Sequence, residues 1–428
     1  MTRGSRDNSM PPIFRKKSVQ STSRKIVFYD FVTHFGGAQR CTTLLSQRLR
    51  KNYDIQVWDA YGCCDRYVAD LRKRDIPFKV ILPRRHNVVI GGVGRLQRYL
   101  RVLCNLPVFA QILLNMFRKM ALEKPDLMWT NSTKALPFLF ICTAAWKVPI
   151  ALYAHGWYLR EQIPSWQRLM IRHFADAVFA VSLETRRAMN QWGVENGKIT
   201  VVYNAVDFTS IRESIVSPDC PARRRKTGAF IVLVPGTLIY AKGQYTVLQA
   251  ARKLKEKNYD FEVWYAGDPG SEDCTGYSAM LRSKADEWQL NSYTRFLGWR
   301  DDMPGLMSEA DVVVLSSHTE GLPMVVQEAL LLRRLVITTP VGGVPDLIEN
   351  GISGFLVPVD DYETLSEKIE WAIQNPDKAA QIAATGHRRY LRLLDPNRQI
   401  NLFCHAVEQT IGSRRSQGNK AVEANPNA

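Results

Sequence analysis

Short apolar runs alternate with longer amphipathic stretches along most of the chain. The apolar runs are rich in β-branched and aromatic residues, which predicts strands buried on both faces, and the stretches between them have helical periodicity. The predicted strands lie at residues 25–29, 55–60, 78–82, 127–130, 150–154, 177–181 and 200–203, and then at 230–234, 261–266, 294–297, 311–315, 336–338 and 354–357. Alternation of strands and helices on this scale predicts two parallel sheets, each covered by helices on both faces.

Breaks in this pattern predict the domain boundaries. Residues 208–228 contain two prolines and a basic run, which is typical of a linker between domains 24–207 and 229–395. Residues 1–23 and 413–428 are polar and predict disordered tails. A last helix over 396–412 would cross back to the first domain. Two such domains form a cleft, and open α/β sheets bind ligands at the carboxyl ends of their strands.

Charge is unevenly distributed between the two halves. Of 57 lysine and arginine residues, 32 lie in residues 1–210, together with only 14 of the 41 acidic residues. This excess points to an anionic ligand or surface. We expect no secretory signal and no membrane span, because no apolar run is long and uninterrupted enough. Eight cysteines without a C-x-x-C pair favour a reduced, cytoplasmic protein over a disulfide or zinc framework.

The basic excess is most concentrated at residues 84–120, which hold seven basic residues and no acidic one. On a helix, Arg95, Arg98 and Arg101 would share a face, beside the apolar residues Leu96, Leu100 and Leu103. Such a helix can lie in the headgroup layer of an anionic membrane, here the inner face of the plasma membrane. It can equally be a solvated helix whose apolar side packs on its own domain, and the sequence leaves both alternatives open.

The most informative chemical pattern lies at residues 316–358. A strand ends at Ser316, and Glu320 and Gly321 then precede a helix that carries Glu328, eight positions after Glu320. Backbone amides at a helix N-terminus can bind a phosphate or a departing oxyanion. A carboxylate that accepts two ribose hydroxyl bonds makes a charge-assisted contact. Two glutamates at this spacing are usually solvated surface residues, so the interpretation depends on the whole arrangement.

That arrangement resembles glycosyltransferase family 4, the retaining enzymes of the GT-B fold with an E-x7-E signature. Several motifs stand in that family's order, over most of the chain from about residue 25 to residue 358. They are Gly36-Gly37-Ala38, His155-Gly156, Val181-Ser182, Asn204-Ala205-Val206-Asp207, Gly236 to Lys242-Gly243, and Glu320 to Glu328. The resemblance implies two Rossmann-like domains facing across a cleft, with the acceptor bound by residues 24–207 and the donor by 229–395.

The resemblance also implies roles for the matching residues. Glu328 would bind the donor ribose, and Glu320 would hold the transferred sugar together with the amides that follow Gly321. Lys242 would neutralise the diphosphate, so that no metal or other cofactor is required; the sequence contains no D-x-D. The rest of the donor site would consist of Gly321, Leu322, Pro323, Met324, Gly236 and Thr237.

Two features of the first half complete the predicted site. Gly36 and Gly37 precede a helix predicted over 39–50, and their amides would contact donor phosphate or acceptor, although a plain strand-to-helix turn has the same pattern. His155 ends a strand on the ligand side of the sheet. Alone it is typical of a hydrogen-bonded structural histidine. By the resemblance it joins Glu320 and Lys242 as a catalytic residue, which contacts sugar or acceptor without acting as a nucleophile.

Thr237 is the main departure from the family, which usually has arginine there beside the phosphates. A hydroxyl supplies no charge, so either the diphosphate is held less strongly or another cation, such as Arg300, substitutes. A catalytically inactive relative is a further alternative. Ala205 and Gln39, where the family often has glycine and glutamate, are milder changes.

The predicted function is transfer of a sugar from a nucleoside-diphosphate sugar to a hydroxyl of a glycan or lipid-linked acceptor, in polysaccharide, lipopolysaccharide or glycolipid biosynthesis. The first half offers no motif carboxylate as a nucleophile, which favours a front-face route for the retaining outcome. A nucleotide-sugar epimerase would share the fold but needs its own acid and base. A nucleic-acid-binding protein would explain the pI of 9.5. We nevertheless expect no nucleic acid partner, because the basic stretch lacks a recognition motif.

Overall fold

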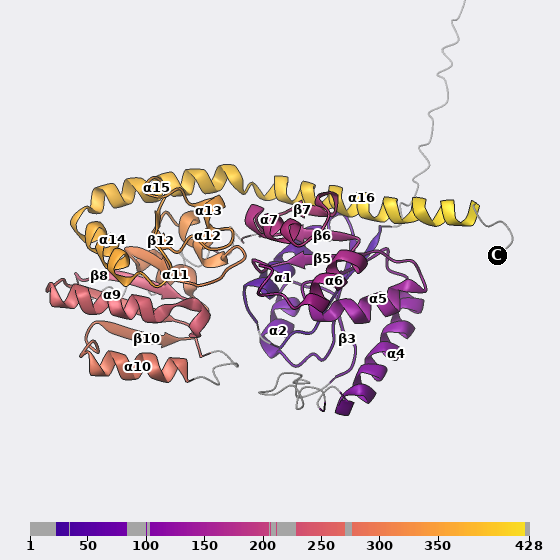
Figure 1. The fold of residues 1–428 in the computed structure, drawn as a ribbon, viewed down its shortest axis with the longest axis horizontal. Coiled ribbons are helices and arrows are strands. Elements are labelled where there is room, and N and C mark those ends of the chain that lie inside the picture. The colour runs from indigo at the N-terminus through magenta and orange to yellow at the C-terminus, as the bar shows by residue number, and fades with distance from the viewer. Residues whose placement is uncertain are drawn as a thin grey trace, which may run out of the picture.

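Two parallel sheets, each in its own domain, build the molecule (Figure 1). The computed structural model describes residues 23–83, 103–204, 228–269 and 276–423 except His34, together with Leu100, Val206 and Ile211. The two-domain α/β architecture predicted from the sequence is confirmed. Outside the described residues lie the tail before residue 23, Arg95, Arg98 and Arg101, Ala205 and Asp207, and the predicted linker except Ile211 and Gly228.

The N-terminal sheet has seven parallel strands in the order β3-β2-β1-β4-β5-β6-β7. Their bounds are β1 Lys25–Asp30, β2 Asp54–Asp59, β3 Phe78–Val80, β4 Leu127–Thr130, β5 Ile150–Ala154, β6 Ala177–Ala180 and β7 Ile199–Val201. Side chains alternate along each strand, so Ile26 and Phe28 of β1 enter one hydrophobic cluster and Val27 and Tyr29 enter another. Both faces of the sheet are therefore buried, as the apolar runs predicted.

Helices cover both faces of this sheet. One face packs against α1 (Gly37–Leu49) and α2 (Asp65–Lys73). The other packs against α4 (Leu106–Glu123), α5 (Leu136–Ala144), α6 (Ser165–Phe174) and α7 (Leu183–Gln191). In α4 the buried residues Val108, Ile112, Met116 and Met120 recur every fourth position, which gives this helix one inward stripe.

The C-terminal sheet has six parallel strands in the order β10-β9-β8-β11-β12-β13. Their bounds are β8 Phe230–Pro235, β9 Phe261–Ala266, β10 Thr294–Gly298, β11 Val312–Leu315, β12 Leu335–Thr338 and β13 Phe355–Leu356. The helices on one face are α9 Gln244–Glu256, α10 Tyr277–Glu287 and α14 Tyr362–Gln374. Those on the other are α11 Met303–Glu309, α12 Met324–Leu331, α13 Val344–Leu347 and α15 Pro376–Leu393.

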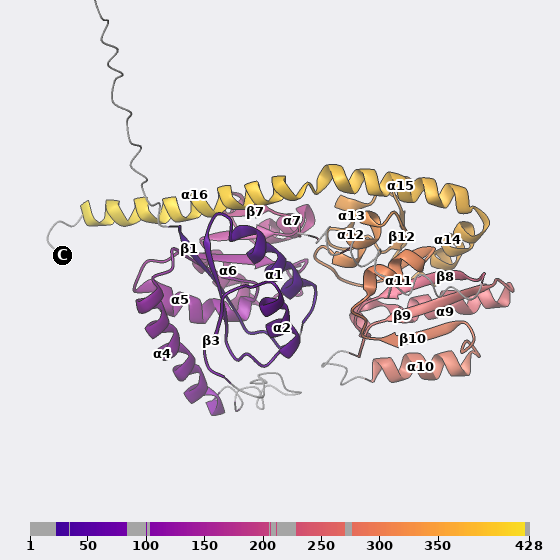
Figure 2. The same ribbon diagram turned by 180° about the vertical axis from the view of Figure 1, so that it is seen from behind.

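The last helix, α16 (Pro396–Glu423), leaves the C-terminal domain and lies along the N-terminal domain (Figures 1 and 2). Phe403 of α16 stacks on Trp129, with ring centroids 4.3 Å apart, and on Phe179 at 4.9 Å. The helix continues well beyond residue 412, so the prediction of a disordered tail from residue 413 is wrong up to Glu423. Residues 413–423 include arginine, glutamine, lysine, alanine and glutamate, which favour helix despite the accompanying serine, glycine and asparagine.

Candidate functional site

The loops after β8 and β11 bring a lysine against a carboxylate. Gly243 is the N-cap residue of α9 and has φ +65°, and a Cβ there would lie 2.0 Å from the carbonyl oxygen of Ser316. Only glycine therefore allows these two loops to approach so closely. Lys242 Nζ lies 2.6 Å from Glu320 Oε1, and Ser317 Oγ donates a hydrogen bond to the same oxygen at 2.7 Å. The predicted phosphate-binding lysine and the first glutamate of the signature thus form an ion pair.

The second glutamate of the signature contacts the other domain. Glu328 of α12 is 2% exposed, and its Oε1 lies 3.2 Å from Nη1 of Arg40 in the first turn of α1. Burial raises the pKa of Glu328, and the guanidinium of Arg40 opposes that rise. Oε1 accepts no hydrogen bond of good geometry from the described residues. Glu328 is therefore a buried carboxylate with spare accepting capacity at the junction of the two domains.

Close backbone contacts surround these carboxylates. A Cβ on Gly321 would lie 1.8 Å from the carbonyl oxygen of His155, so the loops from the two domains touch there without a side chain between them. A Cβ on Gly37 would lie 3.5 Å from Cγ of Met324, which places the start of α1 opposite the start of α12. The structure thus brings the predicted residues of both halves to one contact between the domains.

His155 follows β5, and its ring lies against Tyr153 with centroids 4.2 Å apart. Both ring nitrogens are buried, without a well-oriented hydrogen-bond partner among the described residues. Burial lowers the pKa of His155 to about 3, and the side chain of Asn204 works in the opposite direction. The imidazole is consequently neutral near pH 7, which suits a hydrogen-bonding role and excludes a permanent positive charge.

The other predicted donor-site residues take different positions. Leu322 and Met324 are buried in hydrophobic clusters, so their side chains serve packing. Pro323 is the N-cap residue of α12. The carbonyl oxygen of Thr237, which follows Gly236, accepts a hydrogen bond from Gln244 at 2.8 Å.

The remaining predicted residues keep their hydrogen bonds within their own domains. Arg300, the suggested substitute cation, donates from Nε to Oδ1 of Asp302 at 2.7 Å. At the start of α1, Gln39 Oε1 accepts a hydrogen bond from the backbone amide of Gly36 at 3.2 Å, which satisfies the amide of the N-cap residue. The functional roles of all these residues stay predictions.

Sequence reasoning missed three contacts at this junction. They are the ion pair of Arg40 with Glu328, the hydrogen bond of Ser317 to Glu320, and that of Asn204 Nδ2 to the carbonyl oxygen of Leu322 at 3.0 Å. One signal for Arg40 was present. A cation in the first turn of a helix opposes the helix dipole, which favours anions there, so such an arginine suggests a nearby anion.

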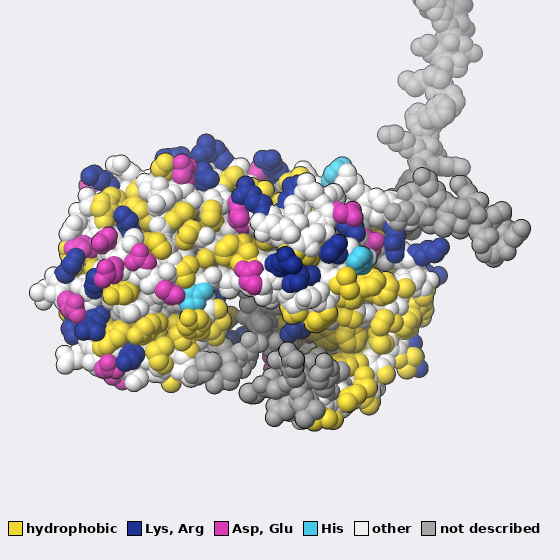
Figure 3. Space-filling model, in the orientation of Figure 1, with side chains coloured by type: hydrophobic (Ala, Val, Ile, Leu, Met, Phe, Trp, Pro, Cys, Tyr) yellow, Lys and Arg dark blue, Asp and Glu magenta, His cyan; other side chains and the backbone are white. Residues whose placement is uncertain are grey.

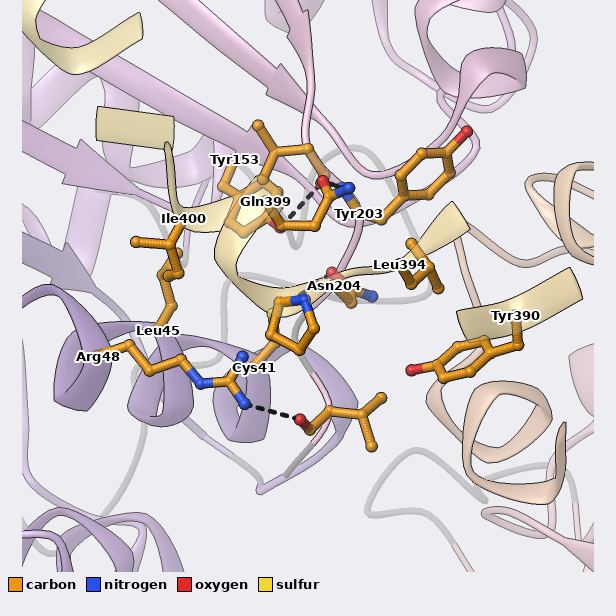
Figure 4. Close-up of a pocket in the computed structure, with 13 residues that line it drawn as sticks. Cys41, Leu45, Arg48, Tyr153, Tyr203, Asn204, Tyr390, Leu394, Gln399 and Ile400 are labelled. Atoms are coloured by element: carbon orange, nitrogen blue, oxygen red, sulfur yellow. Dashed lines mark hydrogen bonds between the residues drawn. The ribbon is translucent and has the colours of Figure 1, made fainter. Parts of the chain in front are cut away.

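A small cavity lies between α1 and the break that separates α15 from α16 (Figure 4). Across its wall Arg48 donates to the carbonyl oxygen of Val206 at 3.0 Å, and Gln399 accepts from the amide of Tyr203 at 3.1 Å. Its volume of about 10 Å³ leaves room for about one water molecule. It is too small for a nucleotide sugar, and it is best described as a packing gap between the domains.

The fold has close counterparts among solved structures. HepE of Anabaena, solved in complex with UDP and glucose, is 23% identical, with a TM-score of 0.76 over 90% of this chain and 99% of that one. Sucrose-phosphate synthase of Thermosynechococcus elongatus is 16% identical, with a TM-score of 0.73 over 91% of this chain and 100% of that one. Two facing Rossmann-like domains of this kind define the GT-B fold.

Two sequence families match the chain, one for each domain. "Glycosyltransferase Family 4" matches residues 35–210, and "Glycosyl transferases group 1" matches residues 220–389. The chain therefore belongs to the group 1, family 4 glycosyltransferases. A relative from Escherichia coli, UDP-Gal:alpha-D-GlcNAc-diphosphoundecaprenol alpha-1,3-galactosyltransferase, is 24% identical over 59% of this chain and 67% of its own length. The chain spans about half the length of other curated relatives that it matches.

Proposed function

We propose that the protein transfers a sugar, with retention and without a metal, from a nucleoside-diphosphate sugar to a hydroxyl group of a glycan or lipid-linked acceptor. The observation that carries this proposal is the ion pair of Lys242 with Glu320 at 2.6 Å, beside the start of α12 where the two domains meet. An ammonium group and the free amides of a helix N-terminus together offer the positive potential that a diphosphate needs. Glu328 would accept the ribose hydroxyls.

The proposed chemistry is a front-face substitution. The acceptor oxygen bonds to the anomeric carbon while the bond from that carbon to the phosphate oxygen breaks, and the departing oxygen takes the hydroxyl proton. Lys242 and the amides of α12 would stabilise the charge that develops on the diphosphate. Two carboxylates near the carboxyl edge of the N-terminal sheet, Asp30 and Asp59, already accept hydrogen bonds from backbone amides. Their engagement supports a route without a covalent glycosyl-enzyme, which mass spectrometry of the reacting protein would contradict by finding a sugar adduct.

Relatives give this proposal a direction for substrates. The Escherichia coli relative is named for a UDP-galactose donor and a diphosphoundecaprenol-linked acceptor, and HepE was solved with UDP. We therefore propose a role in polysaccharide or glycolipid biosynthesis, on the cytoplasmic side of a membrane, and rank UDP first among the nucleotides to test.

The deciding experiment is a thermal-shift panel of UDP, GDP, ADP and CDP, each with a metal chelator. A ligand that binds only the folded state at a hundredfold excess over Kd adds about 2.7 kcal/mol of stability, so one nucleotide should raise the melting temperature clearly. Glu328→Gln should abolish that shift, whereas Glu370→Gln, in a surface pair with Lys257, should keep it. A shift that appears only with added divalent metal would refute metal independence. Conversion of the donor sugar without an acceptor would favour the epimerase alternative.

A further inference from the structure

Exposed apolar side chains gather on three neighbouring helices of the N-terminal domain. They include Leu106 and Leu114 of α4, Phe140 and Ile141 of α5, and Trp166 and Leu169 of α6, which we call the α4–α6 face. Figure 3 shows hydrophobic side chains spread over this part of the domain. Scattered exposed leucines are ordinary on a protein surface, but a contiguous patch indicates a binding surface.

The fold does not explain these outward residues. The inward stripe of α4 already anchors that helix to the sheet, and Leu136 and Leu139 do the same for α5. Ring contacts link the helices into one surface, since Phe117 of α4 meets Trp146 at a centroid distance of 5.6 Å. Residues Leu100 and Leu103, which precede α4, are 52% and 59% exposed and extend the same surface.

The charges on these elements are mainly positive. Arg118 of α4, Lys147 of the turn after α5 and Arg172 of α6 are exposed. Within the described residues of α4, α5 and α6, Glu123 is the single acid, and its carboxylate is bound by Lys25 at 2.7 Å and also by Lys79. The α4–α6 face therefore presents aliphatic and aromatic groups among cations whose charge is not cancelled locally.

We propose that the α4–α6 face docks on an anionic lipid bilayer, with its apolar side chains in the interfacial layer and Arg118, Lys147 and Arg172 among the headgroups. Tryptophan together with basic residues around an aliphatic patch is the composition of a membrane-interface surface. The contact is peripheral, because none of the described helices is long and apolar enough to cross a bilayer.

Docking of the α4–α6 face on a bilayer would also place the candidate site relative to the membrane. The chain runs from His155 directly into α6, and in that connection Gln162 Nε2 donates to Thr319 Oγ1 of the other domain at 3.3 Å. If α6 is bound to the membrane, the connection between His155 and α6, which contacts the other domain, would therefore lie near the lipid surface. Delivery of a lipid-linked acceptor in this way rests on the proposed function. The membrane binding itself does not depend on it.

The test is cosedimentation of the full chain with vesicles, either of phosphatidylcholine alone or of phosphatidylcholine mixed with phosphatidylglycerol. Wild type should bind the anionic vesicles, and more weakly as salt is added. Leu114→Gln with Leu169→Gln should reduce that binding at least tenfold. The matched control is Ile352→Gln with Leu391→Gln, which replaces equally exposed side chains of the C-terminal domain and should bind like wild type. Unchanged melting temperatures would show that both double variants are folded.

Three outcomes would overturn the proposal. The first is that the wild-type protein does not cosediment with anionic vesicles at low salt. The second is a Leu114→Gln, Leu169→Gln double variant that binds anionic vesicles as well as wild type does. This outcome includes the case in which vesicle binding is lost only when Arg95, Arg98 and Arg101 are replaced. The third is a wild-type dimer in solution that this double variant dissociates while vesicle binding persists, which would assign the face to a second copy of the chain. Nucleotide-induced stabilisation should be unaltered in every variant, so failure here leaves the proposed function standing.

Discussion

Replacing Arg40 with methionine should make nucleotide binding depend on pH. Arg40 of the N-terminal domain pairs with Glu328 of the C-terminal domain. Among the described residues, the other glutamate of the signature motif, Glu320, pairs with Lys242 of its own domain. The methionine keeps much of the apolar stem and removes the charge. Glu328 would then be a buried carboxylate without a counter-ion, because Arg40 is the one charged group among the described residues that acts on its pKa. The neighbouring Tyr390 of α15 has a raised pKa and stays neutral.

The magnitude follows from the geometry of the pair. Two unit charges at 3.2 Å attract by about 5 kcal/mol with an effective dielectric constant of about 20. Arg40 is 31% exposed, and solvent therefore screens part of this attraction, which leaves about 2 kcal/mol. Since about 1.4 kcal/mol corresponds to a tenfold change, nucleotide affinity should fall by about thirtyfold at the pH where the loss is largest.

The direction with pH is fixed by the sign of the pKa shift. Burial already raises the pKa of Glu328, and loss of Arg40 raises it further. The ionised fraction, which accepts the ribose hydroxyls, then recovers only at higher pH, so affinity should increase with pH. Fold stability should change in the opposite direction. A carboxyl whose folded pKa is raised stabilises the fold below its unfolded pKa and loses that contribution as pH rises through the folded value.

The assay is isothermal titration with the preferred nucleoside diphosphate from about pH 5 to about pH 9, accompanied by melting curves. Arg252→Met, which breaks an exposed pair with Glu256 on α9, is the matched control and should show neither effect. Combining Arg40→Met with Glu328→Gln should remove the new pH dependence of the melting temperature, because the double variant has no carboxyl group left to titrate at this position. A variant whose affinity and stability follow pH just as wild type does would refute the reasoning.

Three further substitutions test the rest of the site. Lys242→Ala should lower kcat about a hundredfold while changing donor affinity less, because charge on the diphosphate develops in the transition state. Equal losses of kcat, from steady-state kinetics, and of donor affinity, from a binding assay, would argue against that role. Gly321→Ala should force the domains apart, since its Cβ would lie 1.8 Å from the carbonyl oxygen of His155. Small-angle scattering should therefore report a larger radius of gyration than for the control Gly197→Ala, whose added Cβ would meet open space. The lowered pKa of His155, about 3, means that the unfolded chain binds the proton first. Stability should therefore fall by about 1.4 kcal/mol per pH unit below about pH 6, and His155→Gln should flatten this acid limb in urea melts.

Local patterns were sufficient to locate each of the strands that the structure describes in the two sheets. Strands such as β5 and β11 are buried on both faces, so each is an uninterrupted apolar run that needs no knowledge of its neighbours. The ion pair of Arg40 with Glu328 was not accessible in this way. It joins residues of two domains, and their separation depends on how the domains meet, which no periodicity records. The length of α16 was missed because serine and asparagine were weighted above the helix-forming residues around them.

The contact of α16 with the first sheet has a mechanical consequence. At the Leu394–Pro396 break the polypeptide passes from the C-terminal domain to the N-terminal domain, and proline begins the new helix there. Phe403 of α16 is held by its stacking on Trp129, so the end of the C-terminal domain at this break cannot slide freely along the N-terminal domain or drift away from it. Any opening that admits a substrate must therefore be a hinge rotation of one domain relative to the other about the Leu394–Pro396 break.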